Sequence, residues 1–124
     1  MSDKTKAEKQ YTKGIGFYVD GEYEKAAKWY WKAAEKGHAS AQFSLGLMYF
    51  RGDGVEQNYL KAIKWWRLAS DQGCDRAQFN LALMYDSGQG VEKDSEEAYK
   101  WLRLAANQGH SLAEEMLAEL EKDK

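Results

Sequence analysis

Both histidines and the single cysteine of this 124-residue chain recur at one spacing, because His38, Cys74 and His110 are each thirty-six residues apart. Histidine and cysteine are zinc ligands, and a cysteine beside a histidine can act as a nucleophile with its base. A constant spacing, however, indicates equivalent positions on copied units. Such positions lie roughly 8 to 10 Å apart or more, whereas zinc needs its ligands at about 2.0 to 2.3 Å. With no Asp or Asn placed to orient a histidine base, we expect no metal site, no cofactor and no enzyme activity.

The five tryptophans are a second group that could do chemistry, as a stacking platform for sugar rings. Trp29, Trp65 and Trp101 share the thirty-six-residue spacing, which predicts a repeated core position between helices instead of a sugar site. Trp31 and Trp66 fall outside this series, and we expect them to be less enclosed. A glycan-binding role would in addition require export to the cell envelope.

The same spacing extends over whole segments of the chain. Residues 41–73 read AQFSLGLMYFRGDGVEQNYLKAIKWWRLASDQG, and residues 77–109 read AQFNLALMYDSGQGVEKDSEEAYKWLRLAANQG, so most apolar, aromatic and glycine positions agree. An earlier copy matches once a shorter turn at residues 19–22 is allowed. Units of this kind stack on one another instead of folding alone. The sequence therefore predicts one repeat domain, residues 1–124, with units at about 7–38, 39–74 and 75–110 and a capping helix at 111–122.

Each unit has the periodicity of two helices. Apolar residues recur at three- and four-residue steps, as in Ala41, Leu45 and Met48, and glycines between the two helical runs permit the chain to reverse. Asn58 and Asp94 are of N-cap type, and the glutamate three residues after Asp94, Glu97, is placed for a capping box. We expect an all-α, α/α superhelical solenoid of helical hairpins, with helices at about 4–19, 22–36, 39–51, 58–72, 75–87, 94–108 and 111–122.

The composition is typical of a soluble chain, with 44% hydrophobic and 31% charged residues. No apolar run approaches the roughly 20 residues of a membrane span, so we expect none. The net charge of −2 provides no basic field for nucleic acid, and we expect a monomer whose partner is a protein or peptide. Because the N-terminal MSDKTKAEKQ is polar, we expect the chain as written in the cytoplasm, or in the periplasm if a signal peptide was removed.

The motif A-x-x-x-L-G-x-x-Y-x-x-G-x-G-V, followed by K-A, W, A and G, resembles the Sel1-like repeat, a relative of the tetratricopeptide repeat. The first full copy carries Ala41, Leu45, Gly46, Tyr49, Gly52, Gly54, Val55, Lys61, Ala62, Trp65, Ala69 and Gly73. Departures include Asn58, where the family favours Asp, and Ala82, which replaces the packing glycine. The resemblance implies a superhelix whose first helices line a concave groove. It also implies an adaptor, scaffold or regulator that holds peptides or protein surfaces, in bacteria often within signalling or envelope systems.

By the same analogy, the groove side chains are those of the first helices that point away from the second helices. They form an apolar ladder at three- and four-residue spacing, with two arginines and an aspartate near its edges, which suits an apolar or aromatic peptide. The predicted partner-binding residues are Tyr11, Ile15, Tyr18, Phe43, Leu47, Phe50, Arg51, Arg76, Phe79, Leu83 and Asp86. Several of them could instead pack between adjacent repeats. We expect a non-catalytic adaptor that holds a peptide or a partner helix in this groove.

A second hypothesis uses the opposite, convex side of the superhelix. Lys28, Lys64 and Lys100 recur in register on the second helices, which predicts a basic ridge. In this alternative the chain is a regulatory or inhibitory subunit that docks an enzyme or an anionic partner through the ridge. Glutamates such as Glu96 and Glu97 dilute the ridge, and exposed charges commonly serve only to keep a helix solvated.

Overall fold

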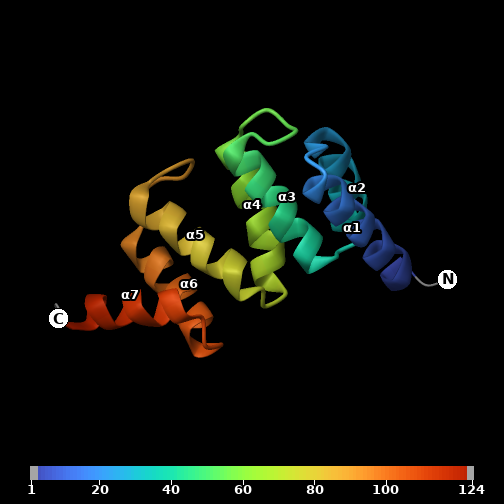
Figure 1. The fold of residues 1–124 in the computed structure, drawn as a ribbon. Coiled ribbons are helices and arrows are strands. Elements are labelled where there is room, and N and C mark those ends of the chain that lie inside the picture. The colour runs from blue at the N-terminus through green and yellow to red at the C-terminus, as the bar shows by residue number, and fades with distance from the viewer. Residues whose placement is uncertain (1–2, 123–124) are drawn as a thin grey trace.

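The computed structural model describes residues 3–122, and these form seven α-helices and no strand (Figure 1). The helices are α1 (Asp3–Val19), α2 (Tyr23–Glu35), α3 (Ala39–Arg51), α4 (Tyr59–Asp71), α5 (Asp75–Ser87), α6 (Ser95–Asn107) and α7 (Ser111–Lys122). Each helix packs on the next one in the chain, so α1–α2, α3–α4 and α5–α6 are hairpins and α7 packs on α6. The predicted all-α solenoid is confirmed, and its helix ends agree with the expected ones to within about one residue.

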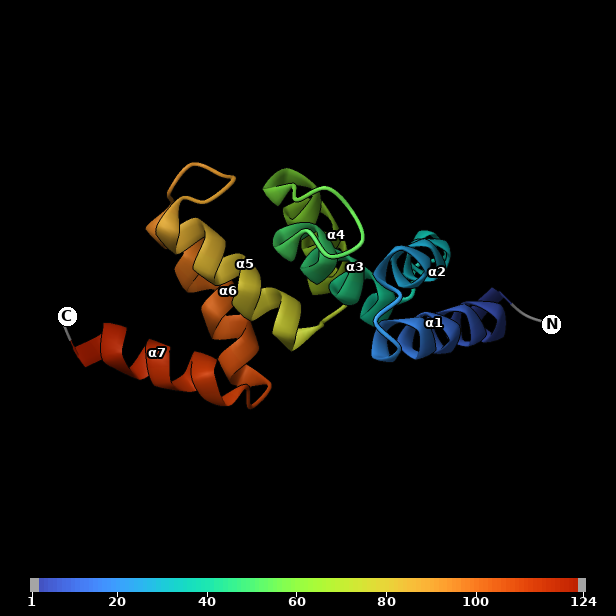
Figure 2. The same ribbon diagram turned by 45° about the horizontal axis from the view of Figure 1, so that its top comes forward.

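The three hairpins lie side by side along the molecule, as Figures 1 and 2 show. In both views the long loops that follow α3 and α5 lie on the same edge. The first helices of the hairpins therefore present side chains on a common face, which is the face of the predicted groove.

The ends of the second helices follow local sequence signals. The side chains of Asn58 and Asp94 each accept a hydrogen bond from the backbone N–H three residues on, at 3.0 and 3.1 Å, as predicted for N-caps. The expected capping box is only half formed, because the Glu97 side chain does not accept a hydrogen bond from the Asp94 N–H. The Glu97 carboxylate accepts a hydrogen bond from Trp101 Nε1 at 3.2 Å, and the Asp94 N–H donates to the backbone oxygen of Tyr85 at 2.9 Å.

Left-handed glycines close each unit, and Gly73 illustrates their role. Its φ of +91° belongs to the region where residues with a Cβ are strained. The N–H of Gly73 donates to the Ser70 oxygen at 2.9 Å, and that of Cys74 donates to the Ala69 oxygen at 3.1 Å. These bonds satisfy the last carbonyls of α4, so the chain reverses at once and α5 begins at the next residue.

Within a hairpin, a glycine of the first helix faces a large ring of the second helix. A Cβ atom on Gly46 would lie 2.4 Å from Trp66 Nε1, and one on Gly14 would lie 2.6 Å from Tyr30 Cδ1. Trp66 is only 2% exposed, and its Nε1 donates to the backbone oxygen of Phe43 at 3.2 Å. The expectation that Trp66 is less enclosed is therefore wrong, because the missing side chain of Gly46 makes room for its ring.

The third hairpin solves the same packing problem with different residues. Ala82 occupies the position of Gly46, and Leu102 occupies the position of Trp66, thirty-six residues on in both cases. Both side chains are buried in one core cluster. A methyl group on the first helix is thus opposed by a smaller side chain on the second helix, so the two helices pack without overlap at this position.

Successive hairpins are joined by buried glutamines. Gln42 donates to the Ala34 oxygen at 3.1 Å, and its own Oε1 accepts a hydrogen bond from Gln72 Nε2 at 3.0 Å. In the next copy, Gln78 Nε2 donates to the Ser70 oxygen at 3.2 Å, and Gln78 Oε1 accepts from Gln108 Nε2 at 2.8 Å. Because a buried amide without partners is costly, the bonds to Ala34 and Ser70 of the preceding units favour one orientation of each unit on its neighbour. Gln42 and Gln78 occupy the same position of the repeat inside an apolar helix face, which was the sequence signal for these contacts.

We predict that Gly46→Ala destabilises the protein by about 1 to 3 kcal/mol, because the added Cβ overpacks against Trp66. Gly16→Ala is the matched control: Gly16 also lies in a first helix but has nothing near its Cβ position, so alanine should stabilise it by up to roughly 1 kcal/mol. Chemical denaturation of the two variants measures both effects. Adding Trp66→Leu to Gly46→Ala copies the Ala82–Leu102 pair and should recover part of the loss. Equal effects of the two alanine substitutions would contradict the packing argument.

Candidate interaction groove

The predicted groove residues occupy three rows, and each row takes one residue from each of α1, α3 and α5. The N-terminal row is Tyr11, Phe43 and Phe79; the middle row is Ile15, Leu47 and Leu83; the loop row is Tyr18, Phe50 and Asp86. The rows differ in exposure and in their neighbours.

The rings of the N-terminal row pack against the start of the following unit. The ring centroids of Tyr11 and His38 are 4.7 Å apart, and those of Phe79 and His110 are 4.6 Å apart. Each histidine directly precedes the first helix of the next unit. One side of each of these rings therefore contacts the following unit. For Tyr11 and Phe79, packing between adjacent repeats thus accompanies any exposure to the groove.

Phe43, the third member of this row, is buried. Only 7% of its surface is exposed, and the Arg76 guanidinium lies 4.5 Å from its ring centroid. This differs from the expectation of a ring that faces the groove. The reason is that Arg76, from the first turn of α5, covers the ring from the next unit. Substituting Phe43 would consequently test core packing and not ligand contact.

The middle row is the accessible one. Ile15 is 39% and Leu83 is 37% exposed, and Leu47 is half-buried between them. Leu47 and Arg51 line two hollows that follow one another along the first helices. One hollow of about 170 Å³ is also lined by Tyr18, Phe43 and Arg76, and one of about 270 Å³ by Phe50, Trp66 and Leu83. The structure thus brings most of the predicted residues together around Leu47.

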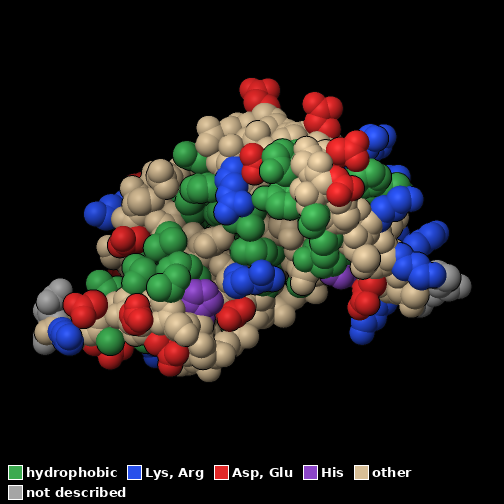
Figure 3. Space-filling view, in the orientation of Figure 1, with side chains coloured by type: hydrophobic (Ala, Val, Ile, Leu, Met, Phe, Trp, Pro, Cys, Tyr) green, Lys and Arg blue, Asp and Glu red, His purple; other side chains and the backbone are tan. Residues whose placement is uncertain are grey.

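The charge pattern of this face is visible in Figure 3. Hydrophobic side chains gather in the middle of the face, and Lys or Arg side chains lie among them. Arg51 and Arg76 are exposed, and both line the hollow between α1 and α3. Apolar contacts and two cationic side chains are therefore available at one place.

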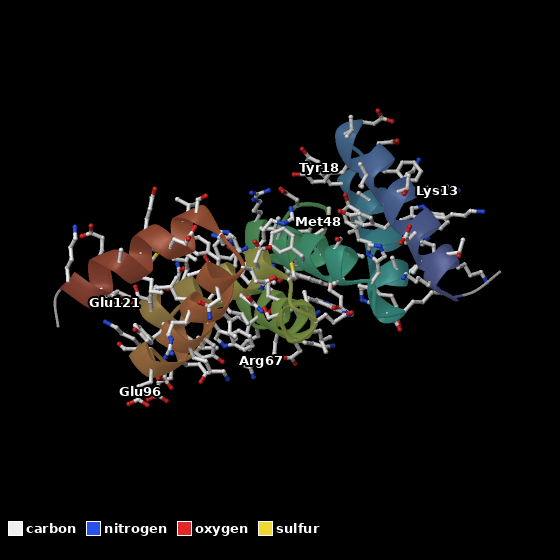
Figure 4. All side chains as sticks on the ribbon, turned by 90° about the horizontal axis from the view of Figure 1, so that it is seen from below. Lys13, Tyr18, Met48, Arg67, Glu96 and Glu121 are labelled. Carbon is white, nitrogen blue, oxygen red and sulfur yellow. The ribbon has the colours of Figure 1, made fainter. Side chains whose placement is uncertain are left out.

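The loop row consists of aromatic rings in the first two units and a carboxylate in the third. Phe50 stacks on Tyr59 with the ring centroids 5.2 Å apart, and Tyr18 lies 5.0 Å from Tyr23. Asp86 takes this position in the third unit and is exposed. Figure 4 shows Tyr18 on the opposite side of the molecule from the second-helix residue Arg67. The groove thus ends in an acidic side chain.

The recurring histidines have a structural role that the sequence reading missed. His38 Nδ1 accepts a hydrogen bond from the Ala41 N–H at 3.1 Å, and His110 Nδ1 accepts one from the Ala113 N–H at 3.2 Å. Both are N-caps, and their place just before an apolar helical run was the available signal. Burial lowers the pKa of His38, although the nearby Glu8 carboxylate opposes this. Within residues 3–122, no group of three or more His, Cys, Asp and Glu side chains could hold a metal ion.

On the second helices, basic side chains lie over aromatic rings of the same helix. Lys64 Nζ is 5.1 Å from the ring centroid of Trp65, and Lys100 Nζ is 4.9 Å from that of Trp101. Both tryptophans are buried, as predicted from their spacing, whereas Trp29 at the equivalent position is half-buried. The cations of the expected ridge are therefore partly engaged within the molecule.

A solenoid of helical hairpins with buried polar contacts between units defines the class: an α-helical repeat protein. The Sel1 repeat family matches three consecutive segments, residues 11–38, 39–74 and 75–110. The chain belongs to the Sel1 repeat family. Sel1 repeat proteins generally mediate protein–protein interactions. No curated protein matches the chain, and none of the helices in residues 3–122 is long and apolar enough to cross a membrane.

Solved structures with the same fold include larger repeat proteins. A Sel1 repeat protein from Oxalobacter formigenes is 38% identical with a TM-score of 0.84, over 89% of this chain and 45% of that one. A protective antigen of uropathogenic Escherichia coli with an SLR fold is 41% identical with a TM-score of 0.79, over 83% of this chain and 23% of that one. The chain thus spans less than half the length of both. Helicobacter pylori cysteine rich protein B shares the fold at 20% identity, with a TM-score of 0.74 over 92% of this chain and 96% of that one.

We predict that the His38 cap makes stability depend on pH. Because the folded state lowers the pKa of His38, the neutral ring stabilises the fold fully above the unfolded value of about 6.5. That contribution is lost as the pH falls from there through the folded pKa. Protonation removes the Nδ1 acceptor, and an N-cap contributes about 0.5 to 2 kcal/mol. The free energy of unfolding should therefore fall between pH 7.5 and 5.5.

The matched variant is His38→Asn, which keeps a cap acceptor that does not titrate in this range. Denaturant unfolding at the two pH values should show a smaller decrease for this variant than for the parent protein. An identical decrease in both would show that His38 is not the group responsible.

Proposed function

We propose that this chain is a non-catalytic interaction module that binds a peptide or a partner helix along the groove of α1, α3 and α5. The observation that carries the proposal is the middle row. Ile15, Leu47 and Leu83 stay accessible although the residues beside them in the helices pack into cores or between units. Contiguous apolar surface of this kind commonly marks a binding site.

The groove also indicates the chemistry of its partner. Apolar side chains of the partner would contact Leu47 and Leu83, because these line consecutive hollows. A carboxylate of the partner, placed between them, would reach Arg51 and Arg76 in the hollow between α1 and α3. An acidic residue flanked by apolar residues is therefore the pattern that fits the middle of the groove.

The alternative is docking of an enzyme or an anionic partner through the basic ridge of the second helices. It has less support, because Lys64 and Lys100 lie over tryptophan rings of their own helix. Lys100 Nζ is also 3.5 Å from the Glu97 carboxylate, which offsets its charge.

The test uses a peptide selected from a display library against the folded domain, titrated against single variants by calorimetry. Leu47→Ala and Leu83→Ala should each weaken binding by about 1 to 2 kcal/mol, roughly 5- to 30-fold, as expected for truncated apolar anchors. Leu68→Ala is the matched control. The exposed fraction of Leu68, 42%, is similar to that of Leu83, but Leu68 lies on the second helix α4. It should leave affinity within a few tenths of a kcal/mol.

Lys64→Glu on the ridge should likewise have little effect, because an exposed charge couples weakly to a distant apolar contact. Loss of binding in Lys64→Glu or Leu68→Ala, with full binding in the two groove variants, would refute groove binding and support the ridge. Circular dichroism spectra of each variant establish that the fold is kept.

A further inference from the structure

An aromatic cluster in the second hairpin has no counterpart in the third. Phe50 lies between Tyr59 and Trp66, with ring-centroid distances of 5.2 and 5.6 Å. We call these three rings the aromatic plug. Thirty-six residues on, the equivalent positions are Asp86, Ser95 and Leu102, so all three rings are replaced by smaller side chains. The backbone of the two hairpins is the same in helix lengths and turns, so the third hairpin has space where the plug would be.

That space is a cleft between α5, α6 and α7. It measures about 400 Å³, within the range of about 300 to 1,000 Å³ common for ligand sites. Ala82, Ala98 and Leu102 line it from the hairpin, and Met116 and Leu120 line it from α7. Ala82 and Leu102 are buried, whereas Leu120 is exposed at the edge. The cleft is thus mainly apolar and open to solvent on one side.

Acidic side chains surround this apolar space. Asp86 and Glu96 both line the cleft, and the Tyr99 hydroxyl at its wall donates a hydrogen bond to the Glu121 carboxylate at 3.1 Å. Figure 4 shows Glu96 and Glu121 at the same end of the molecule. Residues 75–122 contain ten Asp and Glu against five Lys and Arg. Arg103 lies over the Tyr99 ring at 5.4 Å, and the described residues that line the cleft include no Lys or Arg.

We propose that this cleft binds an aromatic side chain of a partner that carries a Lys or Arg next to it in sequence. The aromatic plug shows what fits the position: a planar ring between the first and second helices of the hairpin. The carboxylates of Asp86 and Glu96 at the rim complement a cation beside that ring. This inference rests on the proposed function. The cleft includes Asp86 of the loop row, so it would hold the part of the same partner that lies at the α7 end of the groove.

The direct test uses two small probes that share the phenylalanine and carry residues of opposite charge beside it, acetyl-Phe-Arg-amide and acetyl-Phe-Glu-amide. Each is titrated into the ¹⁵N-labelled full chain and followed by chemical shifts. Acetyl-Phe-Arg-amide should shift the amides of Ala82, Ala98 and Leu102 saturably, and acetyl-Phe-Glu-amide should bind at least about fivefold more weakly, as expected for a partly exposed charge pair. Absence of saturable shifts at these residues with either probe would overturn the proposal.

Two variants separate the ring from the charge. Asp86→Asn keeps the cleft volume and should reduce the preference for the arginine probe to about twofold or less. A quadruple variant with Ala82→Gly, Asp86→Phe, Ser95→Tyr and Leu102→Trp copies the preceding hairpin and should bind neither probe. If the quadruple variant fails to fold, Asp86→Asn still decides the matter, because unchanged discrimination between the probes in that variant would refute the role of the acidic rim.

The remaining outcome concerns a second copy of the chain as the occupant. Sedimentation analysis at rising protein concentration should show a monomer, and self-association that Leu120→Glu abolishes would overturn the proposal in favour of a dimer contact. Failure of the dipeptide probes would leave the effects of Leu47→Ala and Leu83→Ala on the selected peptide unchanged. Failure of the cleft and failure of the groove are therefore distinguishable.

Discussion

The structure depends on the close approach of two helices at a position without a side chain. Gly46 admits the Trp66 ring against the backbone of α3, and Gly14 does the same for Tyr30. Because the large ring comes from the second helix, the two helices of a hairpin are held at a fixed distance. The first two hairpins share this contact, and the third replaces it with Ala82 and Leu102, so the first helices of all three hairpins form one face.

Stacking of the hairpins divides the side chains of that face into those that are used for the fold and those that are free. Rings at the start of each first helix are covered by the next unit, as Phe43 is covered by Arg76. Residues one turn further on, such as Leu47, keep part of their surface accessible and line the hollow shared with Leu83 of the next first helix. Side chains that stabilise the stack and side chains that line the groove therefore come from the same helix, one helical turn apart.

The sequence predicts the helices well because their signals are local. Apolar periodicity, the N-caps Asn58 and Asp94 and the closing glycines all act within a few residues, and the structure agrees with them. Predictions failed where partners distant in sequence decide the outcome. Trp66 is buried because it meets a glycine twenty residues before it. The Asp94 N–H donates to the backbone oxygen of Tyr85, nine residues before it, so the Glu97 carboxylate does not complete the cap and instead accepts from Trp101. The exposure of the groove residues is hard to predict for the same reason, because a side chain of one unit can be covered by a side chain of the next, as Phe43 is by Arg76.

We propose that partners bind the exposed apolar row of the first helices. The most direct test of this proposal is the set of intermolecular nuclear Overhauser effects between a selected, isotope-labelled peptide and the methyl groups of the domain. We predict contacts from the peptide to the methyls of Ile15, Leu47 and Leu83, and none to Leu68 or Leu104 on the second helices. Contacts confined to Leu68 and Leu104, with the three groove methyls unaffected, would contradict the proposal.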